Sequence, residues 1–257
     1  MGASAGTDVT VRALGLPAGT RACLFDLDGV LTRTAVVHAQ AWKQTFDAFL
    51  RRRAHLAGSP FVPFDAVSDY EAYVDGEPRL DGVRTFLASR GITLPEGSSS
   101  DPPEAETVHG LGRRKNELLL ELLERDGVEA YAGSVRYVRA ARDAGLRSAV
   151  VSSSANCREV LDAAGIADLF DVRVDGVTAE REQLHGKPSP DTFLAAARAL
   201  DVAPARAAVF EDALAGVEAG RAGAFALVVG VDRAGQADVL RAHGADLVVD
   251  DLAELLP

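Results

Sequence analysis

The sequence contains little sulfur and no long apolar run, and each absence excludes a class of protein. Its two cysteines, Cys23 and Cys157, are too few for a disulfide framework. No apolar stretch is long enough to span a bilayer. The N-terminal residues lack the basic start and apolar stretch of a secretory signal. We therefore expect a cytoplasmic protein with no membrane partner, and we expect it to be a monomer.

Basic residues are scarce relative to acidic ones. The chain has 27 lysines and arginines against 38 aspartates and glutamates, which gives a net charge of −11. The dense basic run at 51–53 is short and is typical of a solvated helix face. We therefore expect no nucleic-acid partner. An acidic chain repels anions at long range, so a phosphate substrate would need local cations and a metal ion.

Hydrophobic periodicity divides the chain into a helical part and an alternating part. Segments of strand character lie at 21–26, 147–151, 171–174, 206–210, 225–229 and 246–249. Helical periodicity marks 35–53, 68–74, 82–89, 104–125 (interrupted near 110–112), 134–144, 155–164, 190–200, 213–221 and a segment near 238. Strands that alternate with helices predict a parallel sheet with helices on both faces.

The first strand lies far from the others in sequence, so the purely helical stretch reads as an insertion. We predict an α/β protein in which residues 1–34 and 131–257 form the sheet core. Residues 35–130 form an inserted all-helical cap domain, and residues 1–19 are expected to be mobile.

Polar residues follow the strands of the predicted core at their carboxyl ends, where ligands bind in such sheets. These residues are Asp26 and Asp28 after the first strand, Ser152, Ser153 and Asn156 after the second, Lys187 after the third, and Glu211 and Asp212 after the fourth. Carboxylates suit Mg²⁺, which also takes water and phosphate oxygens as ligands. Hydroxyls, backbone N–H groups and a lysine suit a phosphoryl group.

Four motifs carry a resemblance to a known family. They are D-x-D-G-V near the N-terminus, a serine that ends a strand, G-K-P-x-P-D, and an E-D pair. In this order they resemble the haloacid dehalogenase superfamily over nearly the whole chain. The segments "VVSSSAN", "GKPSPDTFLAAA" and "VFEDALAGVEAGRAG" are similar to its β-phosphoglucomutase group. The resemblance implies a Rossmann-like core, a helical cap and Mg²⁺ as cofactor.

The resemblance also implies the roles of the core residues. Asp26 would be the nucleophile that forms an aspartyl-phosphate. Asp28 would be the general acid and base, and its backbone carbonyl would bind Mg²⁺. Asp212, with Glu211, would complete the metal site.

Further core residues would hold the phosphoryl group or the sugar. Ser152 and Lys187 would bind the transferring phosphoryl group, and Ser153 would contribute its backbone N–H. Asn156 would contact the phosphate or the sugar.

The cap residues follow from the same resemblance. His38 and Trp42, one helical turn apart, are similar to a pair that couples cap closure to acid–base positioning. Thr34 matches a hinge threonine. Arg33 stands where many relatives have an aspartate, and we expect it to serve the hinge or its hydrogen bonds rather than the chemistry.

A bisphosphate intermediate would need cations in the cap for its second phosphate. Arg84 and Lys115 are the candidates, and Arg79 competes with Arg84 because the spacing does not align uniquely with the family motif.

The resemblance implies a phosphomutase that converts β-glucose 1-phosphate to glucose 6-phosphate through a sugar bisphosphate. The alternative is a phosphatase that hydrolyses a sugar phosphate or another small phosphomonoester, because only the acceptor differs between the two reactions. A non-catalytic binding protein with the same fold is a third hypothesis. The intact set of carboxylates, serine and lysine argues against it.

Overall fold

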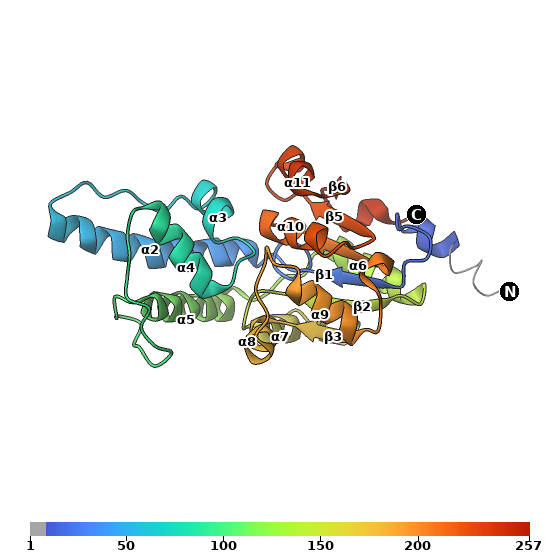
Figure 1. Ribbon diagram of the computed structural model, residues 1–257, viewed down its shortest axis with the longest axis horizontal. Coiled ribbons are helices and arrows are strands. Elements are labelled where there is room, and N and C mark those ends of the chain that lie inside the picture. Colours follow the sequence, from blue (N-terminus) through green and yellow to red (C-terminus); the bar gives the residue numbers. More distant parts are fainter. Residues whose placement is uncertain (1–8) are drawn as a thin grey trace. The chain divides into compact units, whose positions relative to one another are not determined.

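The computed structural model describes residues 9–257, and its elements are labelled in Figure 1. The chain divides into two compact units. The sheet unit comprises the chain up to Arg33 together with Val128–Pro257, and the helical unit comprises Thr34–Gly127. The sequence placed the helical insertion at 35–130.

The sheet unit is built on six parallel strands in the order β3-β2-β1-β4-β5-β6. In sequence order the strands are β1 (Ala22–Phe25), β2 (Arg147–Val151), β3 (Val172–Val174), β4 (Ala207–Glu211), β5 (Leu227–Val231) and β6 (Leu247–Val249). All six lie where the sequence predicted strands, and the parallel α/β fold is confirmed. The strand order reverses at β1, which lies between β2 and β4, and such a switch point is where ligands bind in open parallel sheets.

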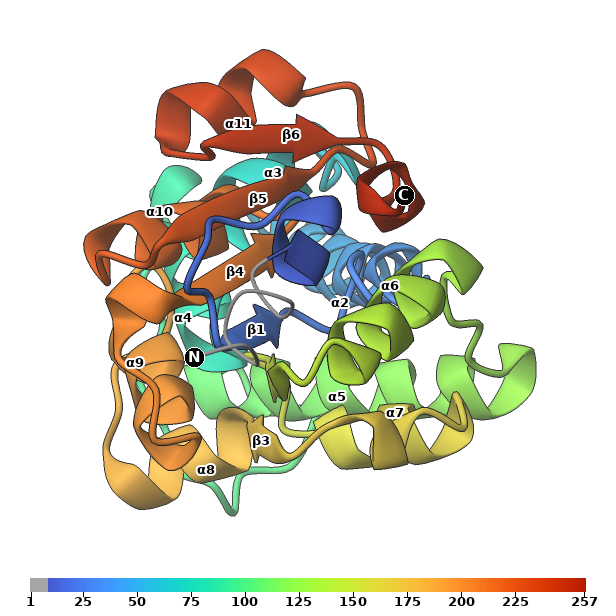
Figure 2. The same ribbon diagram turned by 90° about the vertical axis from the view of Figure 1, so that its right-hand side faces the viewer.

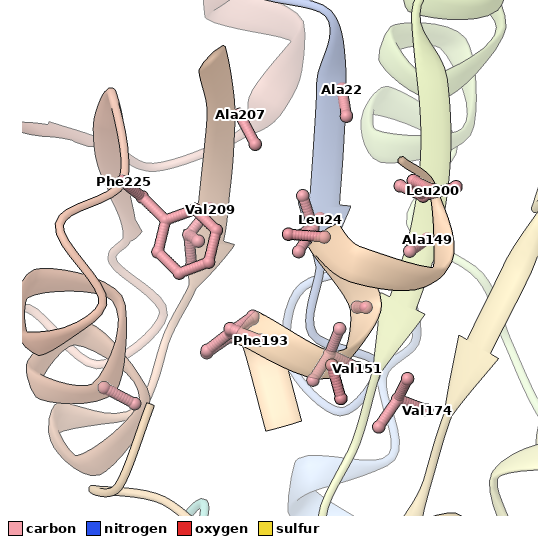
Figure 3. Close-up of a cluster of buried hydrophobic side chains, with 14 residues drawn as sticks. Ala22, Leu24, Ala149, Val151, Val174, Phe193, Leu200, Ala207, Val209 and Phe225 are labelled. Atoms are coloured by element: carbon pink, nitrogen blue, oxygen red, sulfur yellow. The ribbon is translucent and has the colours of Figure 1, made fainter. Parts of the chain in front are cut away.

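Helices cover both faces of the sheet, as predicted (Figure 2). On one side lie α6 (Ala132–Asp143) and α7 (Cys157–Ala163), and on the other lie α9 (Asp191–Ala199), α10 (Leu214–Ala222) and α11 (Ala237–His243). Figure 3 shows how α9 lays Phe193 against the strand side chains Leu24 and Val151. Because every residue of β1 is fully buried, the site at its end rests on a rigid base.

One helix of the sheet unit, α8 (Gly176–Glu182), was not predicted from the sequence. None of its residues is buried, so it has no apolar stripe that a periodicity could reveal. Its N-cap, Asp175, accepts a hydrogen bond from the backbone N–H of Thr178 at 2.8 Å. The helix therefore depends on its cap rather than on packing.

The helical unit contains α2 (Ala35–Ala57), α3 (Ser68–Tyr73), α4 (Arg79–Ser89) and α5 (Val108–Asp126). Residues 34–127 are all described, and they contain no strand. Aromatic residues of α2 lie in the core of the helical unit. There Trp42 stacks on Phe46, and Phe46 packs on Phe86 of α4 with 4.1 Å between the ring centroids. Among the helices of residues 9–257, none combines the length and apolar character needed to cross a bilayer.

Helix α5 corrects the predicted interruption near residues 110–112. The helix starts later than expected, at Val108 behind the N-cap Thr107, and then runs without a break. Its glycines allow close approach instead of breaking it: a Cβ on Gly112 would lie 2.7 Å from the Leu80 side chain of α4.

The expected mobility of residues 1–19 also needs correction. Residues 1–8 lie outside the described part of the chain. Residues 9–13 are helical, and Val11, Leu14 and Leu16 are buried because they pack into the sheet unit. The Tyr137 hydroxyl donates to the Leu14 carbonyl at 2.9 Å, so this segment is part of the fold.

Candidate active site

A buried network of charges lies at the switch point of the sheet. The backbone N–H of Asp26 donates to the Phe210 carbonyl at 2.9 Å, which extends the pairing of β1 and β4 by one residue. The Lys187 ammonium donates to Asp26 Oδ1, to Glu211 Oε1 and, at 3.2 Å, to the carbonyl of Val151. Three neighbouring strand ends are thereby joined by one lysine.

Burial and charge together set the protonation of this network. Lys187 is 2% exposed, Asp26 6% and Glu211 0%. Burial by itself would lower the pKa of Lys187, but the two carboxylates together raise it above its ordinary value. Burial also raises the pKa of Glu211 to about 7, although Lys187 opposes the shift. A buried cation between two acids is stable because each charge keeps a partner.

Two glycines make room for the acidic side chains of the site. Gly29 has a φ of +88°, and a Cβ there would lie 1.7 Å from Asp212 Oδ2. A Cβ on Gly216 would lie 1.8 Å from Glu211 Oε1. The sequence did not reveal the role of Gly216, since a helical glycine gives no local sign of what it faces.

Three carboxylates of the network fit a divalent cation. Oxygens of Asp26, Glu211 and Asp212 lie within 4.8 Å of one another. Glu211 Oε2 accepts the N–H groups of Asp212 and Ala213, and its Oε1 accepts from Lys187, so a cation at Glu211 would share an oxygen that is already hydrogen-bonded. An oxygen-only set of this kind is typical of Mg²⁺ sites. The binding predicted for Asp28 uses its backbone carbonyl and adds to these side chains.

The loop after β2 brings together the predicted phosphate-binding residues. Ser152 is buried, and its Oγ accepts the N–H of Ser154 at 3.0 Å. Ser154 Oγ in turn accepts the N–H of Asn156 at 3.2 Å. Ser153 and Asn156 are partly exposed. Gly176 backs this loop closely, because a Cβ there would lie 2.9 Å from the carbonyl oxygen of Ser153.

Asp28 and Thr34 occupy the segment that follows β1. Asp28 is partly exposed, and the loop behind it is closed by the N–H of Gly29, which donates to the Thr32 carbonyl at 2.8 Å. Thr34 is buried at the N-cap of α2, and its carbonyl accepts the N–H of His38 at 2.9 Å.

The helical unit has a polar cluster of its own. Lys115 on α5 places its ammonium 3.1 Å from His38 Nδ1 and 5.0 Å from the ring centroid of Trp42. Arg79 on α4 donates to Asn116 Oδ1 at 2.5 Å. Burial, then the positive charges of Lys115 and Arg79, hold the pKa of His38 well below its usual range. The imidazole is therefore neutral.

Arg84 does not belong to this cluster. Its side chain is 42% exposed and pairs with Asp81 at 2.5 Å and with Glu96. Arg79 and Arg84 are five residues apart on α4, which turns them about 140° from each other around the helix. The structure thus brings Arg79, rather than Arg84, together with Lys115.

Comparison with known proteins gives the family. A family model described as haloacid dehalogenase-like hydrolase matches residues 20–223. The β-phosphoglucomutase of Mycobacterium tuberculosis is 59% identical over 252 residues, which cover 97% of this chain and 96% of that protein. The chain belongs to the haloacid dehalogenase-like hydrolases.

Other relatives place the chain in the β-phosphoglucomutase group of that family. The β-phosphoglucomutase of Bacillus subtilis is 33% identical over 236 residues, which cover 91% of each chain. A crystal structure of β-phosphoglucomutase from Clostridium difficile matches with a TM-score of 0.71 and 26% identity, covering 92% of this chain and 93% of that one.

For a haloacid dehalogenase-like hydrolase, the arrangement at the sheet edge has a clear chemical use. Asp26 is a carboxylate held against a buried cation, which offsets part of the repulsion between that carboxylate and an incoming phosphate. Asp28, one residue beyond Leu27, has a more exposed setting than Asp26. Two acids in different environments can perform different tasks, one as a nucleophile and one as a proton carrier.

Proposed function

We propose that this protein is a magnesium-dependent β-phosphoglucomutase that converts β-glucose 1-phosphate to glucose 6-phosphate through an aspartyl-phosphate on Asp26. The observation that carries the proposal is the buried contact of Lys187 with Asp26 and Glu211, at the switch point of a chain so similar to the mycobacterial β-phosphoglucomutase. This arrangement supplies a nucleophile and the positive charge that a phosphoryl transfer needs.

We assign the metal to Asp26, Asp212 and the backbone carbonyl of Asp28, with Glu211 as a further ligand. When bound, Mg²⁺ would neutralise charge on the transferring phosphoryl group and orient its oxygens. Lys187 and Ser152 would hold the other phosphoryl oxygens.

The two half-reactions balance through Asp28. When the 6-hydroxyl of the sugar attacks phosphorylated Asp26, a new P–O bond forms and the acyl-phosphate bond breaks, and Asp28 takes the hydroxyl proton. In the second half-reaction Asp26 attacks the phosphoryl group at C1. The C1–oxygen then leaves, and Asp28 returns the proton to it. One carboxyl group thus serves as base and then as acid.

We assign the distal phosphate of the bisphosphate to Lys115 and Arg79 of the helical unit. Two cations suit a phosphate dianion, and a guanidinium can bind two of its oxygens at once. His38, being neutral, would hydrogen-bond a sugar hydroxyl rather than add a third charge. Thr34 would support His38 through their backbone hydrogen bond, and Trp42 would support Lys115, whose ammonium lies over its ring.

A direct product analysis tests the proposal. The protein is supplied with Mg²⁺, β-glucose 1-phosphate and a trace of glucose 1,6-bisphosphate, and glucose 6-phosphate is measured against free phosphate. We expect glucose 6-phosphate as the main product and no turnover when a chelator removes the metal. Rapid release of phosphate without glucose 6-phosphate would establish the phosphatase instead. The monomeric state stays a prediction, which light scattering after size-exclusion chromatography tests.

A further inference from the structure

Arg233 lies at the sheet edge and has no role in the function proposed above. It follows β5 in a short loop that its neighbour fixes: Asp232 Oδ1 accepts the N–H groups of Ala234, Gly235 and Gln236 at 2.7 to 3.1 Å. The side chain of Arg233 is 20% exposed. Because the Arg233 side chain is mostly buried and its loop is fixed, the guanidinium is held in one orientation.

The guanidinium of Arg233 joins the loop after β1 to the C-terminal part of the chain. Its Nε donates to the carbonyl of Gly29 at 2.8 Å, and one terminal nitrogen donates to the carbonyl of Asp250 at 2.6 Å. The same nitrogen lies 3.8 Å from Asp251 Oδ2. These contacts fix the guanidinium between the C-terminal part of the chain and the active-site loop after β1, where its hydrogen-bond partner is Gly29.

Gly29 is held at each of its backbone groups. Its N–H donates to the Thr32 carbonyl, its carbonyl accepts from Arg233, and the space of the missing Cβ is filled by the Asp212 carboxylate. Asp28 directly precedes it. The bond from the Gly29 N–H to Thr32 orients the peptide between Asp28 and Gly29, and the bond from Arg233 orients the next peptide, between Gly29 and Val30. Both sides of Gly29 are thus fixed.

Arg233 also stacks on the segment where the chain returns to the sheet unit. Its Cζ lies 3.7 Å from the ring centroid of Tyr131, and Cζ of Arg33 lies 4.5 Å from the same centroid. Arg33 in turn donates from its backbone N–H to the Glu129 carbonyl at 2.9 Å. The chain leaves the sheet unit after Arg33 and re-enters at Val128, so these three side chains connect both crossover segments.

We propose that Arg233 is a positioning residue for the metal and proton-transfer loop. By holding the Gly29 carbonyl, it fixes the backbone conformation of Gly29, and through it the direction of the preceding Asp28 carbonyl toward the cation and the placement of Asp212 against Gly29. The stack of Arg33, Tyr131 and Arg233 anchors this loop to the two crossover segments. The inference rests on the roles proposed for Asp28 and Asp212, and it gives Arg33 a place in support of the loop rather than in the chemistry.

The test compares Arg233→Met with Arg241→Met. Methionine keeps much of the apolar contact of Arg233 but cannot donate to Gly29. Arg241 is a matched control because it is an exposed arginine of α11 that pairs with Asp238. Binding of Mg²⁺ is measured by calorimetry without substrate, and kcat and KM are measured with β-glucose 1-phosphate.

We expect Arg233→Met to weaken Mg²⁺ binding by about 10-fold and to lower kcat by about 10- to 100-fold, the range typical of residues that orient metal ligands. The KM for the sugar phosphate should stay within about 3-fold, since no sugar contact is removed. Arg233→Lys should recover part of both losses, because its ammonium can donate to one carbonyl. Arg241→Met should match the parent protein.

Parent-like Mg²⁺ binding and kcat in Arg233→Met would overturn the inference, as would an equal loss in Arg241→Met. Should Arg233→Met fail to fold by circular dichroism, Arg233→Leu replaces it, because leucine carries no donor at the position of Nε. Failure of the proposed function gives a different result: the parent protein then lacks mutase turnover, while the calorimetric comparison of the variants still decides the role of Arg233.

Discussion

The two units of the protein each hold a cluster of ionisable groups that is shielded from water. Burial acts on the central base of both clusters in the same direction, and the neighbouring charges act in opposite directions. In the sheet unit, the carboxylates of Asp26 and Glu211 outweigh burial and raise the pKa of Lys187. In the helical unit, burial and the cations Lys115 and Arg79 act together and lower the pKa of His38. The partner's charge therefore decides whether a buried base keeps its proton. One unit holds a fixed cation, and the other holds a neutral imidazole.

Removing the nucleophile should have the largest effect. We expect Asp26→Asn to lower kcat by about 10⁴-fold or more, because an amide cannot form the aspartyl-phosphate. Steady-state formation of glucose 6-phosphate measures the loss. Asp238→Asn, at a fully exposed carboxylate of α11, is the control. Turnover within 10-fold of the parent would remove Asp26 from its assigned role.

Removing the cation of the sheet unit should break its cluster. Lys187→Met leaves two buried acids without their common partner, which should lower the free energy of unfolding by about 3–5 kcal/mol. Chemical denaturation followed by circular dichroism measures the change. Arg158→Met removes an exposed pair with Asp162 and should stay within about 0.5 kcal/mol. If both variants are equally stable, the network is not the paired cluster described above.

The helical unit allows a direct comparison of two arginines. We expect Arg79→Met to raise the KM for glucose 1,6-bisphosphate by about 10- to 100-fold, as expected for one lost charged contact of 1.4 to 3 kcal/mol. Arg84→Met should change this KM by less than about 2-fold, because Arg84 lies outside the cluster of Lys115. The exposed ion pairs that it loses contribute little to stability. Initial rates at varied bisphosphate measure both constants. The reverse order would return the assignment to Arg84.

The smallest effect should be a pH dependence of stability in the helical unit. Because the pKa of His38 is lowered in the folded protein, the unfolded chain binds this proton first, at its ordinary pKa of about 6.5. Stability is therefore complete above that pH and falls below it, by at most about 1.4 kcal/mol per pH unit. Trp42 is the one tryptophan of the chain and lies in this unit, so its fluorescence follows the unfolding.

His38→Gln should flatten this pH dependence of stability. His55→Gln, at an exposed histidine of the same helix, is the control and should leave it unchanged. An unchanged slope in His38→Gln would mean that another group titrates.

Much of the sheet unit was predictable because its signals are local. The six strands are apolar runs, and the order of the polar residues after them was enough to expect Asp26, Lys187 and Asp212 at one edge. Helix α8 and the start of α5 were not predictable in this way, since the first lacks an apolar stripe and the second depends on a cap and a close packing partner.

Three-dimensional packing separates the two arginines of α4 between which the spacing left the choice open. Arg79 and Arg84 are residues of the same type and lie close together in sequence. They differ in the face of α4 on which they lie. The contact of Arg233 with Gly29 joins residues 204 positions apart in the chain, which no local pattern can reveal.

Fold class, family and the set of groups that can carry phosphoryl transfer follow from the sequence alone, because periodicity and motif order are properties of neighbouring residues. Which of these groups meet depends on how the chain packs in three dimensions. The packing pairs Lys187 with Asp26 and Glu211, brings Arg79 rather than Arg84 together with Lys115, and places Arg233 against the loop of Asp28. Each choice depends on distances across the fold, which are set when the strands and helices pack.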